Sequence, residues 1–96
     1  MKREFLVAVE EFCARQSIEP EFINSLEQTG LITLVTIEET GYINSSQIRQ
    51  LEAFIRLYYE LDINLEGIET VTHLLEKIKS LQEEILYLKN RLRLFE

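Results

Sequence analysis

The chain of 96 residues has no tryptophan, one cysteine, one proline and three glycines. Its cysteine, Cys13, has no partner for a disulfide within the chain, which favours a reducing compartment. Gly30, Gly41 and Gly67 stand far apart, so the sequence contains no glycine-rich loop of the kind that binds phosphate. The longest apolar run, residues 5–9, is much shorter than the roughly 18–20 residues of a membrane span. We therefore expect a cytoplasmic protein without a membrane partner.

Catalytic and metal-binding residue types are equally scarce. His73 is the only histidine, and a histidine that acts as a general acid or base needs a carboxylate beside it in a cleft. We expect His73 to be exposed or to flank a coiled coil. Cys13 is predicted to be a small buried core residue, and one thiol without a neighbouring histidine cannot build a tetrahedral metal site. The sequence thus predicts no catalytic residue, no metal site and no cofactor, and the protein is not expected to be an enzyme.

Positive charge is also in short supply. Seventeen Asp and Glu residues against ten Lys and Arg give a net charge of −7. Residues 16–48 contain five glutamates and neither lysine nor arginine. An acidic chain repels nucleic acid and anionic membranes, and it suits a basic protein surface. Hydrophobic residues make up 46% of the chain, which favours a folded domain over intrinsic disorder.

The first third of the sequence predicts a strand followed by two short helices. Residues 4–8 include the aromatic Phe5 and the β-branched Val7, residue types that favour a strand, and residues 9–16 have helical spacing. Pro20 suits the first position of a second helix because its missing N–H would be unpaired there, and Gly30 can take the left-handed conformation that ends this helix. Two short helices joined by a turn are a helix-turn-helix signature. The apolar faces expected in the two helices are Val9, Phe12 and Cys13, then Phe22, Ile23 and Leu26.

A small hairpin, or wing, is predicted after the second helix. Residues 31–37 are apolar and β-branched, residues 38–41 form a turn, and Tyr42 and Ile43 return as a second strand.

Two more helices are predicted after the wing. Asn44 and Gln47 have the spacing of a capping box for a third helix. Apolar residues continue at helical spacing to about residue 61, and Asn64 is a suitable N-cap for a final helix.

The final helix carries the most regular pattern of the sequence. Between residues 71 and 95 its apolar side chains alternate by three and four, which is the a/d repeat of a coiled coil. The preceding residues are too few to cover this stripe, so we predict a homodimer, parallel or antiparallel. The alternative is a tail folded back on its own domain. We divide the chain into a winged helix-turn-helix-like domain, residues 1–62, and a dimerisation helix, residues 63–96. The predicted dimer interface consists of Val71, Leu74, Ile78, Leu81, Ile85, Leu88, Leu92 and Phe95.

The order helix, turn, helix, wing, helix and coiled-coil tail resembles that of MerR-type regulators. IEPEFINSLEQTGLI (residues 18–32) is similar to their second helix and entry to the wing, and IRQLEAFIRL (residues 48–57) is similar to the helix after the wing. DINLEGI (residues 62–68) resembles the turn and cap before their last helix. The resemblance implies a mainly α, MerR-like winged helix-turn-helix fold.

A closer resemblance is to a divergent branch, the chaperone-modulator family, related to the bacterial modulator of a curved-DNA-binding J-domain co-chaperone. It covers nearly the whole chain and is carried by EFC (11–13), Ile18, GLI (30–32), RL (56–57), ELDIN (60–64), GI (67–68) and LL (74–75). Members of that branch are small, lack an effector domain and bind a J-domain to restrain the co-chaperone. The resemblance therefore implies a protein-binding modulator, an inhibitor of a J-domain co-chaperone.

Charge distinguishes this function from DNA binding. The second helix and the wing of a DNA reader need cations that neutralise phosphates, and here both lack them. J-domains present a positively charged helix, as the family resemblance implies, and an acidic surface complements it. The alternative function is a MerR-type DNA-binding transcriptional regulator. In that family Tyr58 and Tyr59 could line a small-molecule pocket, but we expect core or dimer packing. The partner-binding residues we predict are the glutamates Glu19, Glu21, Glu27, Glu38 and Glu39, with Phe22, Ile37 and Tyr42 as apolar anchors.

Overall fold

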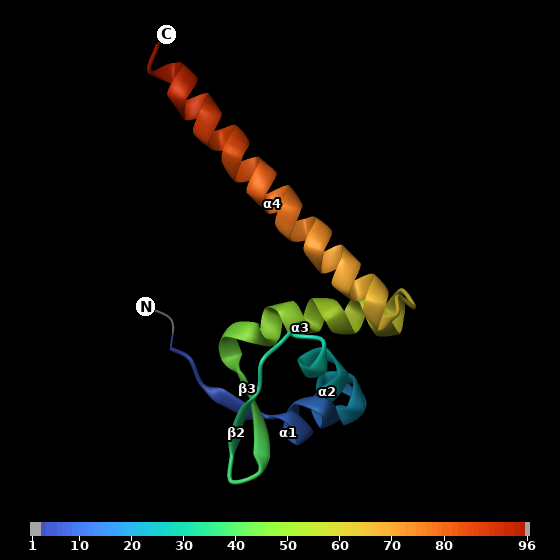
Figure 1. The fold of residues 1–96 in the computed structure, drawn as a ribbon. Coiled ribbons are helices and arrows are strands. Elements are labelled where there is room, and N and C mark those ends of the chain that lie inside the picture. The colour runs from blue at the N-terminus through green and yellow to red at the C-terminus, as the bar shows by residue number, and fades with distance from the viewer. Residues whose placement is uncertain (1–2, 96) are drawn as a thin grey trace.

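The computed structural model describes residues 3–95 and contains the predicted mainly helical fold with a small sheet. Helices α1 and α2 lie on one side of α3, the β2–β3 hairpin projects from the same part, and α4 extends away as a separate rod (Figure 1). The elements are β1 (Leu6–Ala8), α1 (Val9–Gln16), α2 (Pro20–Gln28), β2 (Val35–Ile37), β3 (Thr40–Asn44), a 3-10 turn η1 (Ser45–Gln47), α3 (Ile48–Ile55), a π-helical turn η2 (Arg56–Glu60) and α4 (Leu65–Arg93).

Helices α1 and α2 form the predicted helix-turn-helix. Helix α1 ends at Gln16, and Ser17 after it takes a left-handed conformation with φ of 56°. Pro20 lies in the first turn of α2, and Gly30 follows its end with φ of 82°, so both predicted boundaries are confirmed. The residues predicted to face the core are all buried: Val9, Phe12, Cys13, Phe22, Ile23 and Leu26.

The wing belongs to a three-stranded antiparallel sheet with the strand order β1–β3–β2. Leu6 of β1 lies opposite Asn44 of β3, and Val35 of β2 lies opposite Tyr42 of the same strand. The sequence predicted β1 as a strand but not its pairing with β3, because a three-residue strand carries no signal of its partner. This pairing ties the wing to the start of α1.

The turn of the wing is shorter than the sequence predicted. The prediction of a turn over residues 38–41 is wrong, since only Glu38 and Glu39 connect the strands and Thr40 already belongs to β3. Both turn residues have positive φ, 48° and 66°, the conformation of a two-residue hairpin turn whose twist matches that of the strands. The strand predicted over residues 31–37 is also shorter than expected, since β2 begins only at Val35.

The capping box predicted at Asn44 and Gln47 is half correct. The Asn44 side chain accepts a hydrogen bond from the Ser46 N–H at 2.9 Å and so caps η1. The Gln47 amide instead forms two hydrogen bonds with the backbone of Thr33, at 2.9 and 2.7 Å. Gln47 therefore holds the loop before the wing against the start of α3, a role that its spacing from Asn44 does not reveal.

The chain turns sharply between α3 and α4. Helix α3 continues into η2, where the Leu61 N–H reaches back five residues to the Arg56 carbonyl, and Asp62 then adopts a left-handed φ of 53°. The Asn64 side chain accepts a hydrogen bond from the Gly67 N–H at 2.8 Å, which confirms the predicted N-cap of α4.

The hydrophobic core lies between α1, α2, the sheet and α3, and α4 contributes only its first turns. Ile68 of α4 is fully buried, whereas Val71 and Thr72 are half-buried and the described residues after Thr72 are exposed. The alternative of a tail folded back on its own domain is therefore wrong for this structure. The buried core consists of Val9, Phe12, Cys13, Phe22, Ile23, Leu26, Ile32, Ile43, Leu51, Phe54 and Ile68.

Candidate functional site

The five glutamates predicted to bind a partner are all exposed on or next to α2 and the wing. Glu19 precedes α2, Glu21 lies in its first turn and Glu27 near its end, while Glu38 and Glu39 form the tip of the wing. None of them forms an ion pair within residues 3–95. Their carboxylates are therefore free to attract a positively charged partner.

A groove of about 280 Å³ lies between α2 and the wing. Glu10 of α1 and Glu39 of the wing both line it, next to the apolar side chains of Val9, Pro20 and Leu34. Neither lysine nor arginine is among the lining residues. We call this cavity the α2–wing groove. The groove combines negative charge with apolar surface. A long basic side chain suits such a groove, because its aliphatic stem can pack on the apolar surface while its charged end meets a carboxylate.

The structure brings only Glu39 of the five predicted glutamates into the groove, and it adds Glu10, which is not among the residues predicted from the sequence. Glu10 lies in the first turn of α1, before the segment without lysine or arginine (residues 16–48). Most of α1 and all of α2 separate it from the wing in the sequence. Only the pairing of β1 with β3 brings the start of α1 next to the wing. Glu10 could have been predicted as a groove residue only if the pairing of β1 with β3 had been known.

The three predicted apolar anchors differ in exposure. Ile37 at the end of β2 is 47% exposed and can contact a partner. Tyr42 is half-buried. Phe22 is a core residue with only 6% of its surface exposed, so it cannot anchor a partner in this structure. Its ring packs inside the molecule because α2 turns this face toward η2.

The basic residues of the described part of the chain belong to elements other than α2 and the wing. Arg15 at the end of α1 forms an ion pair with Glu11, one turn earlier. Arg49 and Arg56 are exposed on α3 and η2. The cations that a DNA reader would place on the second helix and the wing are thus absent from these elements. We call the face that carries Glu19, Glu21, Glu27, Glu38 and Glu39 the α2–wing surface, and its charged residues are all negative.

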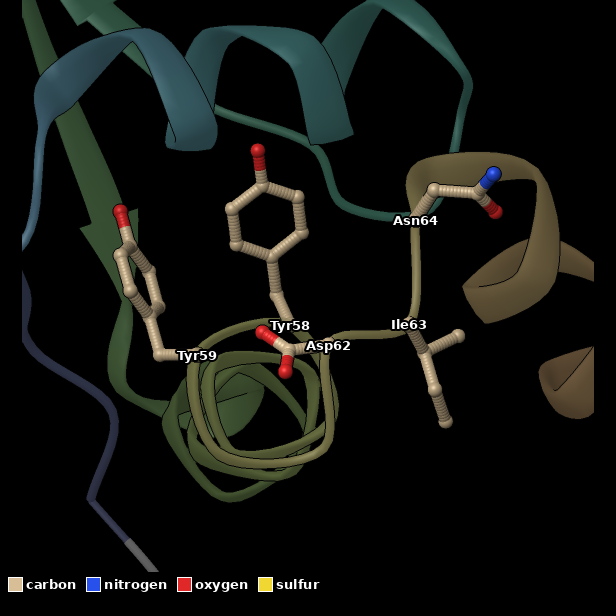
Figure 2. Close-up of a pocket in the computed structure, with 5 residues that line it drawn as sticks. All are labelled: Tyr58, Tyr59, Asp62, Ile63 and Asn64. Carbon is tan, nitrogen blue, oxygen red and sulfur yellow. The ribbon is translucent and has the colours of Figure 1, made fainter.

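A second cavity, of about 350 Å³, opens where η2 meets α4 (Figure 2). It is lined by Tyr58, Tyr59, Asp62, Ile63 and Asn64, and we call it the aromatic notch. Tyr58 and Tyr59 are 37% and 42% exposed. Their expected packing in the core is therefore only partly correct: each ring touches the core through Phe22, with centroids 4.5 and 5.5 Å apart, and remains open to solvent.

The apolar stripe of α4 has no partner among residues 3–95. Leu81 and Leu88, at its middle, are each 50% exposed, as expected for side chains on an isolated helix. The other predicted interface residues are also exposed, except Val71, which is half-buried: Leu74, Ile78, Ile85, Leu92 and Phe95.

Cys13 and His73 lie where the sequence predicts, Cys13 in the core and His73 exposed on α4. Cys13 is 3% exposed, and burial raises the pKa of its thiol, with a further contribution from the carboxylates of Glu21 and Glu19. His73 is exposed on α4. Within residues 3–95, no three His, Cys, Asp or Glu side chains lie close enough together to hold a metal ion. No helix in this part of the chain is long and apolar enough to span a membrane.

Two short helices, a β-hairpin and a third helix packed around one core define a winged helix-turn-helix protein, extended here by a long helix. The family model described as MerR HTH family regulatory protein matches residues 7–90, and the chain belongs to this family. It is a family of regulatory proteins without enzymatic activity. No curated protein and no solved structure matches the chain.

Proposed function

We propose that this MerR-family regulator acts by binding a basic protein through α2 and the wing. The observation that carries the proposal is the charge of these two elements, which hold five exposed glutamates and neither lysine nor arginine. Opposite charges steer two proteins together and suppress wrong partners. The α2–wing groove adds apolar surface, which supplies affinity where charge alone supplies mainly rate.

The partner that we propose is the J-domain of a co-chaperone, whose activity the protein would restrain. The support is the resemblance to the chaperone-modulator branch, carried by residues 11–13, 18, 30–32, 56–57, 60–64, 67–68 and 74–75, together with the positively charged helix that J-domains present. The family match identifies the MerR family as a whole and adds nothing for this branch.

A DNA-binding transcriptional regulator is the second candidate, and the family match favours it over the J-domain partner. DNA binding is the usual function of the family, and the winged helix-turn-helix fold is suited to it. However, fold does not determine function, and phosphate contacts need cations at the elements that meet the duplex. We place protein binding first because α2 and the wing present carboxylates there instead.

We also propose that two copies associate through α4. The support is the a/d stripe on a helix of 29 residues, with exposed leucines and isoleucines along its length. Such a stripe in water favours a coiled coil, and charged residues beside it are compatible with either orientation. The dimer would present two α2–wing surfaces.

Parallel binding titrations distinguish the two candidate functions. Fluorescence anisotropy is measured for a labelled isolated J-domain and, separately, for a labelled duplex from the promoter of the protein's own gene, both at physiological salt. The proposal predicts saturable binding to the J-domain and no binding to the duplex tighter than about 10⁻⁶ M, the range of non-specific contacts. Tight duplex binding without J-domain binding would establish the DNA-binding candidate instead.

A further inference from the structure

The aromatic notch is the feature of the molecule that the fold and the acidic α2–wing surface leave unexplained. Two tyrosines adjacent in sequence stand side by side on η2 and point toward α2 (Figure 2). Their ring centroids are 5.0 Å apart with an interplanar angle of 73°. The hydroxyl of Tyr59 accepts a hydrogen bond from the Glu19 N–H at 3.4 Å, which fixes one ring against the start of α2.

The backbone beneath the two rings departs from regular helix. Residues Arg56–Glu60 form a π-helical turn, a rare feature that occurs frequently at functional sites. Asp62, two residues after this turn, has a φ of 53°, a left-handed conformation that is uncommon for a residue other than glycine. Strained backbone of this kind persists where the surrounding structure holds it, and it clusters at ligand sites.

The chemistry of the notch is that of a receptor for a positively charged group. Aromatic faces attract cations through their quadrupole. The Asp62 carboxylate lines the same cavity, and it accepts no hydrogen bond and forms no ion pair within the described chain. No basic residue lines the cavity. Three acidic residues, Glu19, Glu60 and Asp62, lie at or next to the elements that hold the two rings, against one basic residue, Arg56 at the start of η2, so the balance of charge there is negative.

We infer that the aromatic notch binds a lysine or arginine side chain of a protein partner, held against the two tyrosine rings and paired with Asp62. The inference rests on the proposed function, because a basic protein at α2 and the wing would bring such side chains close. Tyr59 contacts Glu19, and the adjacent Pro20 lines the α2–wing groove, so the start of α2 borders both cavities. One partner can therefore occupy the groove and the notch together.

The test uses the full chain and two peptides, a capped hexapeptide of arginine and a matched hexapeptide of glutamate. Ring and backbone NMR signals are followed during titration. The inference predicts saturable shifts of the Tyr58 and Tyr59 rings with the arginine peptide only, while the ring of Tyr87 on α4 serves as the internal reference. Asp62→Asn should weaken binding by about two- to fivefold, the ratio that corresponds to the loss of one exposed ion pair. Asparagine tolerates a left-handed φ, so this variant should keep the fold.

Glu69→Gln is the matched control, because it removes one negative charge from an exposed position of α4 and should leave the affinity unchanged. Equal loss in both variants, or unchanged binding by Asp62→Asn, would overturn the notch as the site.

If a groove variant, Glu39→Gln, weakens binding while Asp62→Asn does not, the notch fails and the proposed function stands. If the arginine peptide shifts no signal at all, both fail. A third ligand is a single arginine with both ends capped. If it binds as tightly as the hexapeptide, the notch takes a small free cation and not a protein side chain.

Discussion

Glu38 and Glu39 at the tip of the wing combine negative charge with an unfavourable backbone conformation. Both have positive φ, which costs roughly 1 kcal/mol or more for a residue with a Cβ, and asparagine and glycine are the residues that hairpin turns of this kind prefer. Neither glutamate has an ion-pair partner among residues 3–95. The conformational cost is consistent with a role for these carboxylates outside the folding of the chain.

Replacing the pair by the preferred turn residues should therefore stabilise the fold and weaken partner binding. We expect the double variant Glu38→Asn, Glu39→Gly to raise the free energy of unfolding by about 1 kcal/mol, measured by urea denaturation at fixed protein concentration. The control variant Glu21→Gln, Glu27→Gln removes the same charge from a regular helix and should change stability by no more than about 0.5 kcal/mol. A destabilised wing variant would contradict this explanation of the turn.

Cys13 should be chemically inert in the native protein. Its thiol is buried, and burial together with Glu21 and Glu19 raises its pKa, so less thiolate is present at any pH near neutrality than in the unfolded chain. We expect its reaction with a disulfide reagent at pH 8 to be much slower than in denaturant. Equal rates in the native and unfolded states would show that the thiol is accessible.

At the scale of the elements, the start of α4 depends on a glycine inside a helix. A Cβ on Gly67 would lie 2.6 Å from Cγ2 of Ile63 and 3.1 Å from Oδ1 of Asn64, the atom that caps the helix. The corner between η2 and α4 is therefore packed too closely for a side chain at this position.

Gly67→Ala should consequently destabilise the protein, although alanine is favoured over glycine in a helix by about 1 kcal/mol. We expect the free energy of unfolding to fall by about 1–2 kcal/mol, because the Asn64 cap or the Ile63 side chain must move. Thermal denaturation followed by circular dichroism measures the effect, with Glu69→Ala in the same helix as the control for propensity alone. A stabilised Gly67→Ala protein would show that the corner relaxes freely.

The sequence predicted local structure well and long-range contacts poorly. Pro20, Gly30 and Asn64 mark helix boundaries through their own backbone chemistry, so the boundaries of α2 and the start of α4 could be predicted from single residues. The contact of Gln47 with Thr33 and the entry of Glu10 into the α2–wing groove depend on residues that only the folded chain brings together. The π-helical turn that aligns Tyr58 with Tyr59 has no signal in a pattern of helical spacing.

At the scale of the whole molecule, no other described element packs against most of the length of α4, whose described residues after Thr72 are exposed. Burying Leu81 and Leu88 in a coiled coil would contribute about 1.5–3 kcal/mol for each side chain. We expect the wild type to sediment as a dimer at micromolar concentration and the variant Leu81→Glu, Leu88→Glu to sediment as a monomer. Glu83→Gln, Glu84→Gln on the same helix is the control. A monomeric wild type would remove the proposed role of α4.

The central claim is that the acidic α2–wing surface binds a basic protein, and reversal of its charge tests this most directly. Titration calorimetry with a J-domain compares the wild type, the variant Glu21→Lys, Glu27→Lys, Glu39→Lys, and a control with Glu69, Glu76 and Glu83 of α4 changed to lysine. These are exposed positions in both variants, so both should fold. The account predicts an affinity about tenfold or more lower for the α2–wing variant, a similar loss for the wild type on raising the salt concentration, and little change for the control. Equal affinity of the wild type and the folded α2–wing variant at low salt would contradict it.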